Sequence, residues 1–293
     1  MRILNLKTFL LFLAPALLLY SLFYAGPIVS GLYYGFTDWK GVSFSANWIG
    51  LDNFRNVFSD PLFATALRNM LILSVVVIAV QHAISIFLAV LLDQKLRGVV
   101  WMRAVIFYPA ILNTVVIGYI WSYMYSPFVG FLPKFFEALG LDTLAGIDWL
   151  GRTDTAIYAI SFVIIWQYTG YSMMIYMAGL QGISSDIYES ASIDGANARQ
   201  KFFRITLPLL VPAITVNTVL SVIGNMKQFE HIWVMTQGGP ANSTQVFGTL
   251  IYQFAFKTSQ PGYGTAMAIL LSVLIMLVTV TIIRALGRWE VKQ

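Results

Sequence analysis

The chain alternates between long apolar stretches without charge and shorter segments in which the charged residues gather. Six stretches contain no Asp, Glu, Lys or Arg: Thr8 to Thr37, Asn69 to Leu92, Ala104 to Phe131, Thr155 to Ser185, Ile205 to Met226 and Thr258 to Ile283. A helix of ~20 mostly apolar residues crosses the hydrocarbon core of a bilayer, where every backbone polar group must be hydrogen-bonded internally. The pattern therefore predicts an all-α polytopic membrane protein, with six transmembrane helices in one domain over residues 1–293.

The composition agrees with a membrane-embedded chain. Of the 293 residues, 58% are hydrophobic and 11% are charged, and the mean hydropathy of +0.74 is far from that of a soluble domain. Arg2 and Lys7 precede the first apolar stretch, which contains Ala14-Pro15-Ala16, a pattern that resembles a signal-peptide cleavage site. Because the apolar run continues to about Phe36, we expect a retained helix instead of a cleaved signal.

The charged segments predict the orientation in the membrane. Six spans place both termini on one side, where the segments hold eleven basic and five acidic residues, against seven basic and eight acidic residues on the other side. Because basic residues accumulate on the cytoplasmic side, we expect both termini in the cytoplasm of a bacterial or archaeal plasma membrane. The pI of about 9.3 follows from this basic collar beside anionic lipid, which argues against a nucleic-acid partner. The sequence has no cysteine, which excludes disulfides and thiolate metal sites.

The connection over residues 181–208, between the fourth and fifth stretches, is too patterned for a simple turn. Asp186 and Glu189 have the spacing of a capping box, so we expect a helix to begin there. Asp194-Gly195 supplies a left-handed residue that ends a helix, and a second helical pattern runs from Ala196 to Arg204. The residues alone leave two interpretations open: an amphipathic helix lying on lipid headgroups, or a docking element for a protein partner.

Two runs in this connection resemble a known family. Glu-Ser-Ala-Ser-Ile-Asp-Gly-Ala at 189–196 and Phe-Phe-Arg-Ile-Thr-Leu-Pro-Leu-Leu at 202–210 are similar to the EAA loop of permease subunits of binding-protein-dependent ABC importers. The second position of the loop is Ser190 where the family's name has Ala, a change between small residues. Gly-Leu-Asp-Asn-Phe at 50–54 and Thr-Gln-Gly-Gly-Pro at 236–240 resemble pieces of the carbohydrate branch, the maltose and multiple-sugar permeases.

The resemblance implies an assembly. The chain would form half of a pore beside a second, homologous permease, and the sugar branch favours two different permeases over a homodimer. Two ATPase subunits and an extracytoplasmic solute-binding protein would complete the importer. ATP and Mg²⁺ would be bound by the ATPase, because this chain has no Gly-x-x-x-x-Gly-Lys-Ser/Thr loop for phosphates. The chain itself would hold no cofactor and no metal, and would catalyse no reaction.

The resemblance also assigns roles in residues 181–208. The EAA loop would form a coupling helix that sits in a cleft of the ATPase and transmits its closure to the membrane helices. Glu189 would make a polar contact with the ATPase, Ala191 would allow close approach, and Asp194 and Gly195 would form the turn. This favours the protein-docking interpretation over the headgroup one.

A sugar path needs hydrogen-bonding and aromatic side chains that face an interior cavity. The candidates are residues of the fourth and fifth stretches and the turn after them: Gln167, Tyr171, Ser221, Gly224, Asn225 and Gln228. Ser221, Asn225 and Gln228 are spaced to share one helical face. Compared with maltose permeases, these three and Gly224 fall at sugar-contacting positions, although Gly224 and Gln228 differ in type. Interhelical hydrogen bonding is the alternative role for each of them.

Other functions fit the sequence less well. A self-sufficient secondary carrier usually binds its coupling ion through charged groups inside the membrane, and the six stretches contain none. Their one histidine, His82 beside Gln81, is expected to be a packed interhelical residue. An intramembrane enzyme would need paired carboxylates or a metal-ligand cluster in the spans. Glycerol-phosphate permeases share the motif pieces at 50–54 and 236–240, so a glycerol-phosphate or other polyol substrate stays an alternative to a sugar.

Overall fold

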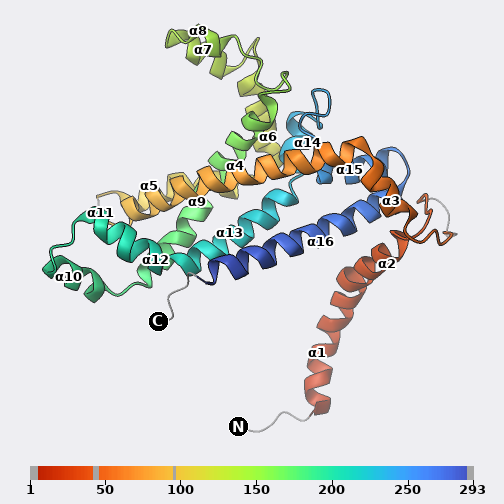
Figure 1. The fold of residues 1–293 in the computed structure, drawn as a ribbon, viewed down its shortest axis with the longest axis horizontal. Coiled ribbons are helices and arrows are strands. Elements are labelled where there is room, and N and C mark those ends of the chain that lie inside the picture. Colours follow the sequence, from red (N-terminus) through yellow and green to blue (C-terminus); the bar gives the residue numbers. More distant parts are fainter. Residues whose placement is uncertain (1–5, 42–45, 95–96, 289–293) are drawn as a thin grey trace. The chain divides into compact units, whose positions relative to one another are not determined.

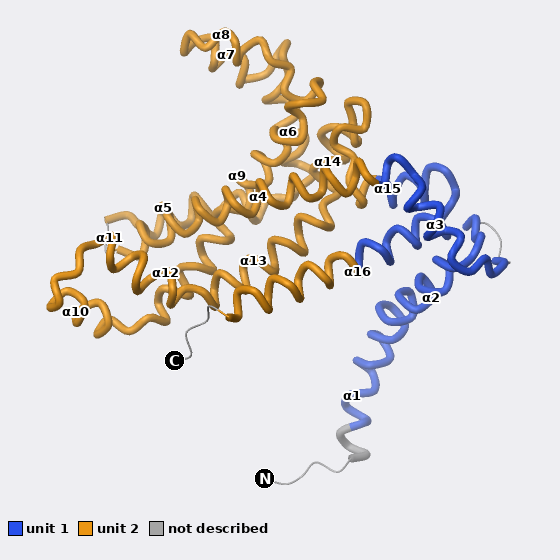
Figure 2. The backbone as a smooth tube through the Cα atoms, viewed as in Figure 1, with its two compact units in different colours: residues 1–63, 250–272 blue, residues 64–249, 273–293 orange. Residues whose placement is uncertain are grey.

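The computed structural model describes residues 6–41, 46–94 and 97–288. Within these ranges the chain is helical apart from turns, loops and one antiparallel bridge between Thr37 and Trp48. It forms two compact units, residues 1–63 with 250–272 and residues 64–249 with 273–293 (Figure 1, Figure 2). The prediction of an all-α chain is confirmed, while the single membrane domain stays a prediction.

The first unit contains the N-terminal helices and the beginning of the last helix. Its elements are α1 (Leu6–Tyr20), the π-helical turn η1 (Ser21–Ala25), α2 (Gly26–Tyr34), α3 (Asp52–Ser59), the π-helical turn η3 (Gln253–Lys257) and the first part of α16 (Pro261–Leu286). Pro15 removes one backbone donor from α1, and the wider turn η1 follows. Residues 10–34 are apolar enough to cross a membrane and bury none of that surface inside the chain, so this helix needs lipid or another subunit around it.

The second unit is built around α9. Its elements are α4 (Pro61–Leu92), α5 (Val99–Ile111), α6 (Thr114–Tyr125), α7 (Phe131–Ala138), α8 (Asp142–Ala145), α9 (Ala156–Gln181), α10 (Ser185–Ile193), α11 (Ala198–Lys201), η2 (Phe202–Thr206), α12 (Leu207–Leu209), α13 (Val211–Met226), α14 (Glu230–Met235) and the first part of α15 (Phe247–Tyr252). Helix α9 packs along α5 and α13 (Figure 1). Gly170 permits the α5 contact, because a Cβ there would lie 2.1 Å from the carbonyl oxygen of Ile106. The sequence thus brings two helix backbones together at a residue without a side chain.

The apolar helices only partly match the six predicted spans. Among the described residues, three helices are long and apolar enough to cross a membrane, or up to five if each of two bent pairs counts as one span. The third predicted span, Ala104 to Phe131, is wrong as a single helix, because α5 and α6 meet at 97°. Asn113 starts α6 by accepting hydrogen bonds from the N–H groups of Val115 and Val116. The exact number of spans stays a prediction.

A buried apolar cluster fixes one end of this unit. Its members come from α4, α9 and the residue before α13: Ala89, Leu92, Met173, Tyr176, Met177, Leu180 and Leu210. These side chains are almost fully buried, and contacts between helices in a membrane are stabilised by close van der Waals packing of this kind. The cluster therefore holds α4 and α9 at a fixed spacing next to the polar cavity described below.

Candidate functional site

A cavity of about 400 Å³ lies within the second unit, lined mainly by α9 and α13, with Gln81 of α4 and Ala110 of α5. Five of the six predicted path residues line it: Tyr171, Ser221, Gly224, Asn225 and Gln228. Its volume falls within the ~300–1,000 Å³ of small-molecule sites. A side chain at Gly224 would meet no atom within 4 Å, so the absence of a Cβ there leaves room in the cavity itself.

The cavity wall also contains polar residues beyond these five. Gln81 Nε2 donates to Ser172 Oγ at 2.7 Å, and Ser172 Oγ donates to Asn217 Oδ1 at 3.2 Å. All three side chains are buried, and they come from α4, α9 and α13 in turn. Asn217 lies four residues before Ser221, so the helical face read from Ser221, Asn225 and Gln228 extends one turn further. The three-residue chain fixes polar groups at the cavity wall.

His82 joins the same three helices. Its Nε2 lies 3.0 Å from Ser221 Oγ, and its Nδ1 lies 2.7 Å from the hydroxyl oxygen of Tyr176. A neutral imidazole with its proton on Nε2 satisfies both contacts, since the Tyr176 hydroxyl then donates to Nδ1. The prediction that His82 is a packed, hydrogen-bonded interhelical residue is confirmed.

Gln167, the sixth predicted path residue, does not line the cavity. Its side chain is fully buried; Oε1 accepts a hydrogen bond from His231 Nε2 at 2.7 Å, and Nε2 donates to the Leu112 carbonyl at 3.3 Å. Gln228 in turn donates to Nδ1 of His231. Gln167 therefore joins the break between α5 and α6 to α14, and it reaches the cavity only through His231 and Gln228.

His231 was missed by the sequence analysis because it lies in the short helix α14, outside the six apolar stretches. Its spacing three residues after Gln228 was the available signal, since residues at i and i+3 can lie together on a helical turn. Among the residues that the structure describes, no group of three His, Cys, Asp or Glu side chains could hold a metal ion.

The segment 181–208 contains the predicted helix-turn-helix with corrected boundaries. The capping box predicted at Asp186 and Glu189 is wrong: α10 begins after Ser184, whose hydroxyl accepts from the Asp186 N–H at 3.3 Å. A capping box does occur at the second helix, where Asn197 and Gln200 exchange hydrogen bonds at 2.8 and 2.9 Å. That helix, α11, is short and continues into the π-helical turn η2.

The end of α10 matches the prediction for Gly195. The residue has φ +79°, a left-handed conformation that favours glycine. The N–H of Ala196 donates to the Ala191 carbonyl at 2.9 Å, and the N–H of Gly195 donates to the Ser192 carbonyl at 3.1 Å. These two bonds form a Schellman motif, in which Ala191 accepts and Asp194 is the capping residue.

Two side-chain contacts join α10 to the elements that follow it, α11 and η2. The Tyr188 hydroxyl lies 3.0 Å from Thr206 Oγ1 in η2, and Lys201 Nζ donates to Ser192 Oγ at 2.6 Å. The remaining surface of α10 is open: Glu189 is exposed and Ile193 is 87% exposed. Glu189 and Ile193 are four residues apart, so they share one exposed face of α10.

The chain was compared with known protein families. The family model described as "Binding-protein-dependent transport system inner membrane component" matches residues 82–291. The chain belongs to this family. The match contains α9, α13 and the 181–208 segment, so the family resemblance read from the EAA loop is confirmed.

Relatives of this inner-membrane component extend over nearly the whole chain. It is 37% identical over 275 residues to a probable ABC transporter permease protein of Pyrococcus horikoshii, with 94% of each chain covered. It is 33% identical over 280 residues to the multiple sugar-binding transport system permease protein MsmF of Streptococcus mutans, covering 96% of this chain and 95% of MsmF. The protein is thus an ABC transporter permease over nearly all of this chain.

A solved structure shares the permease fold. It is the crystal structure of a bacterial alginate ABC transporter in complex with an alginate pentasaccharide-bound periplasmic protein. The TM-score is 0.81 at 24% sequence identity, and the match covers 94% of this chain and 93% of that one. At this identity the comparison establishes the fold alone.

Proposed function

We propose that this permease is the membrane-spanning pore subunit of an ATP-driven importer that moves a sugar or oligosaccharide into the cytoplasm by alternating access. The cavity carries this proposal. Tyr171 supplies an aromatic face, and Asn217, Ser221, Asn225 and Gln228 supply groups that both donate and accept hydrogen bonds. A sugar presents hydroxyls and flat C–H faces, which such a lining can bind without any charge.

The absence of charge in the cavity lining favours a neutral polar substrate. None of the residues that line it is Asp, Glu, Lys or Arg. A glycerol-phosphate would place a dianion in a buried site without a cation, at a large desolvation cost. The relative MsmF is named for multiple sugars, which supports a sugar over a glycerol-phosphate as the substrate.

Movement would come from a separate ATPase through residues 181–208. Four residues would contact the ATPase or shape the helix that contacts it: Glu189, Ala191, Asp194 and Gly195. The Tyr188 to Thr206 contact links α10 to η2 and α12, which lead into α13 and the cavity. Closure of two ATPase subunits on ATP and Mg²⁺ would therefore reorient the cavity-lining helices. We place this segment and both termini in the cytoplasm, on the basis of the basic residues there.

The complete importer would contain a second permease, two ATPase subunits and an extracytoplasmic solute-binding protein. The alginate transporter of similar fold was solved with a periplasmic protein that carries the saccharide, which supports the last of these partners. This chain would be non-catalytic and would hold no cofactor or metal.

Uptake of labelled oligosaccharides by cells that express the importer tests the proposal. We expect Glu189→Lys and Gly195→Pro to abolish uptake and substrate-stimulated ATP hydrolysis while the chain still inserts. Normal transport by both variants would refute the coupling role. Sugar movement by the purified chain alone in liposomes, driven by a proton or sodium gradient without ATP, would instead establish a secondary carrier.

A further inference from the structure

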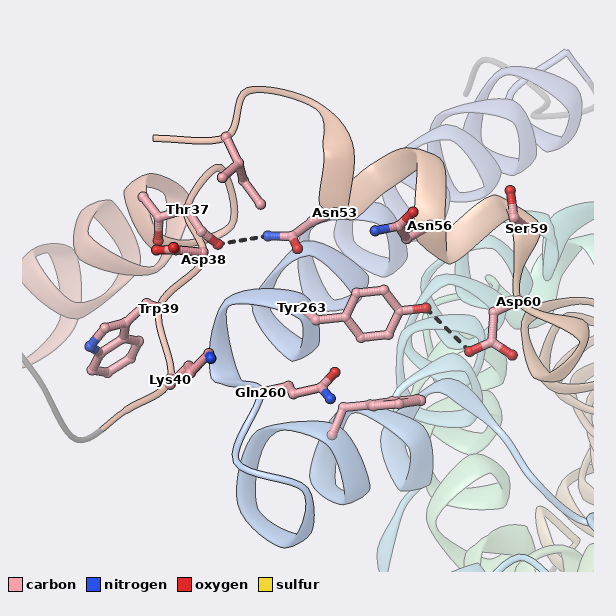
Figure 3. A pocket seen from close by; sticks show the side chains of 12 residues that line it. Thr37, Asp38, Trp39, Lys40, Asn53, Asn56, Ser59, Asp60, Gln260 and Tyr263 are labelled. Atoms are coloured by element: carbon pink, nitrogen blue, oxygen red, sulfur yellow. Dashed lines mark hydrogen bonds between the residues drawn. The ribbon is translucent and has the colours of Figure 1, made fainter. Parts of the chain in front are cut away.

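A second pocket lies in the first unit, separate from the cavity described above. It has a volume of about 490 Å³ and is formed by the segment after α2, by α3, and by the chain that leads into α16. Figure 3 shows the ring of Tyr263 across its middle, with Asn53 and Asn56 on one side and Gln260 on the other. The volume is in the ~300–1,000 Å³ range of sites that hold small molecules.

Asn53 presents a fixed hydrogen-bond acceptor to this pocket. Its Nδ2 donates to the carbonyls of Gly35 and Thr37, both at 2.9 Å, so both amide hydrogens are used and the orientation of the amide is determined. The side chain is 7% exposed. Oδ1 accepts no hydrogen bond from the described residues and faces away from the two carbonyls (Figure 3). An acceptor held this firmly is preorganised for a ligand hydroxyl.

Two further polar groups at the pocket, the side-chain amides of Asn56 and Gln260, have no hydrogen-bond partner among the described residues, and the ammonium group of Lys40 interacts with Asp38 through its charge. The two amides both donate and accept, as a ligand hydroxyl does. Together with Asn53 and Lys40 they offer donors and acceptors from three separate segments. Such a lining suits a polyhydroxylated molecule.

Aromatic rings complete the lining. Tyr263 and Phe254 pack as a T-shaped pair with centroids 4.8 Å apart, and Trp39 lies at the edge of the pocket, stacked on Tyr34 at 4.1 Å. The Tyr263 hydroxyl donates to Asp60 Oδ2 at 3.2 Å, which holds the ring in place. Rings fixed beside convergent amides can pack against the C–H faces of a sugar ring while the hydroxyls bind the amides.

The charges argue for a neutral ligand. Two carboxylates and one ammonium group line the pocket, and both carboxylates are already engaged by the protein. Asp60 accepts from the Leu62 N–H at 2.8 Å as well as from Tyr263. Asp38 accepts from the side chain and backbone of Asn47, and these bonds hold the pKa of Asp38 below its ordinary value. The net negative charge disfavours a sugar acid or sugar phosphate.

We infer that this pocket is a second saccharide site, which binds a neutral sugar unit on the extracytoplasmic side of the permease. The inference rests on the proposed function for its sugar class and its orientation. It concerns residues that the transport cavity does not use, so the two sites can be tested apart.

The natural absence of cysteine permits a direct test. Asn56→Cys and Gln260→Cys each introduce a single thiol into the full-length chain in lipid nanodiscs, and the rate of maleimide labelling is measured with and without maltotriose, diacetylchitobiose or a glucuronate oligomer. Arg55→Cys is the matched control, since this exposed neighbour on α3 does not line the pocket. At a neutral sugar concentration about tenfold above Kd, we expect labelling of the two pocket thiols to slow about tenfold, with no effect at position 55.

The outcomes separate this site from the proposed function. If the sugar still slows thiol labelling in a variant that also carries Asn225→Ala in the transport cavity, the binding is assigned to the pocket of the first unit. Labelling that no neutral sugar slows, in a chain that still supports uptake, overturns the inference and leaves the proposed function intact. Protection by the unliganded solute-binding protein alone, or by the glucuronate oligomer in preference to the neutral sugars, also overturns it.

Discussion

The hydroxyl of Tyr188 in α10 lies 3.0 Å from Oγ1 of Thr206 in η2. Thr206 is buried, whereas α10 has no buried residue among its nine. The contact therefore ties an exposed surface helix to the base of the helix that lines the cavity. A second side-chain hydrogen bond, from Lys201 Nζ to Ser192 Oγ, joins α10 to α11.

Tyr188→Phe should weaken the transmission of movement without preventing insertion. The change removes a hydrogen bond worth about 0.5–1.5 kcal/mol and keeps the ring. We expect the uptake per ATP hydrolysed to fall several-fold at an unchanged amount of protein in the membrane. Tyr119→Phe on α6 is the control, because Tyr119 is 65% exposed and makes no hydrogen bond with the described residues. Equal coupling ratios in the two variants would contradict the proposed link.

Gly195 should tolerate asparagine better than valine. Its φ of +79° is the constraint, because no atom lies within 4 Å of a Cβ built there. A left-handed conformation costs an ordinary residue about 1–2 kcal/mol, and asparagine adopts it more readily than a β-branched residue. We expect Gly195→Asn to retain most uptake and Gly195→Val to lose it. Similar uptake by both variants would show that the turn is not needed in this conformation.

Two Gly→Ala changes should have different effects on stability. Gly170→Ala places a methyl group against the backbone of Ile106, where nothing flexible can move away, and overpacking of this kind costs about 1–3 kcal/mol. Gly224→Ala meets no atom. Thermal unfolding in detergent should therefore give a lower midpoint for Gly170→Ala and a native one for Gly224→Ala. A larger side chain, as in Gly224→Phe, should exclude long oligosaccharides before short ones in uptake assays.

Gln167 and Asn225 should separate a structural role from a substrate role. Gln167→Leu leaves the His231 N–H and the Leu112 carbonyl unpaired, at about 1–3 kcal/mol for each buried group, and should lower the unfolding midpoint. Asn225→Ala breaks no side-chain hydrogen bond among the described residues, and should raise the KM for uptake about tenfold, equivalent to about 1.4 kcal/mol, with a native midpoint. A raised KM for Gln167→Leu with an unchanged unfolding midpoint would show that Gln167 belongs to the substrate path, as the sequence predicted.

Much of the fold and part of the site could be predicted from the sequence. Uncharged stretches of membrane length give helices directly, because lipid permits little else. Gly195 was predictable because a glycine directly after a helical pattern commonly adopts the left-handed conformation that ends the helix. Of the five cavity residues, Ser221, Asn225 and Gln228 were predictable from their helical spacing and Tyr171 from its aromatic ring, whereas Gly224 was predicted only through the resemblance to maltose permeases.

The remaining features depend on tertiary contacts that local patterns do not contain. Gln167 and Tyr171 are four residues apart on α9, yet only Tyr171 reaches the cavity, since Gln167 is held by His231 on another helix. The start of α10 was misplaced because Ser184 and Asp186 are both acceptable caps, and only the backbone shows which one accepts. The break before Asn113 could have been inferred, because Asn followed by Thr and an apolar run is a helix-start signal.

The hydrogen-bonded chain from Gln81 through Ser172 to Asn217 bears on how the polypeptide is made. Its three members lie about 90 and 45 positions apart, so a ribosome delivers them one after another. Until Asn217 arrives, Gln81 and Ser172 can pair with each other, and only the Ser172 hydroxyl lacks an acceptor. The polar junction of the three helices is therefore complete only once α13 has been inserted.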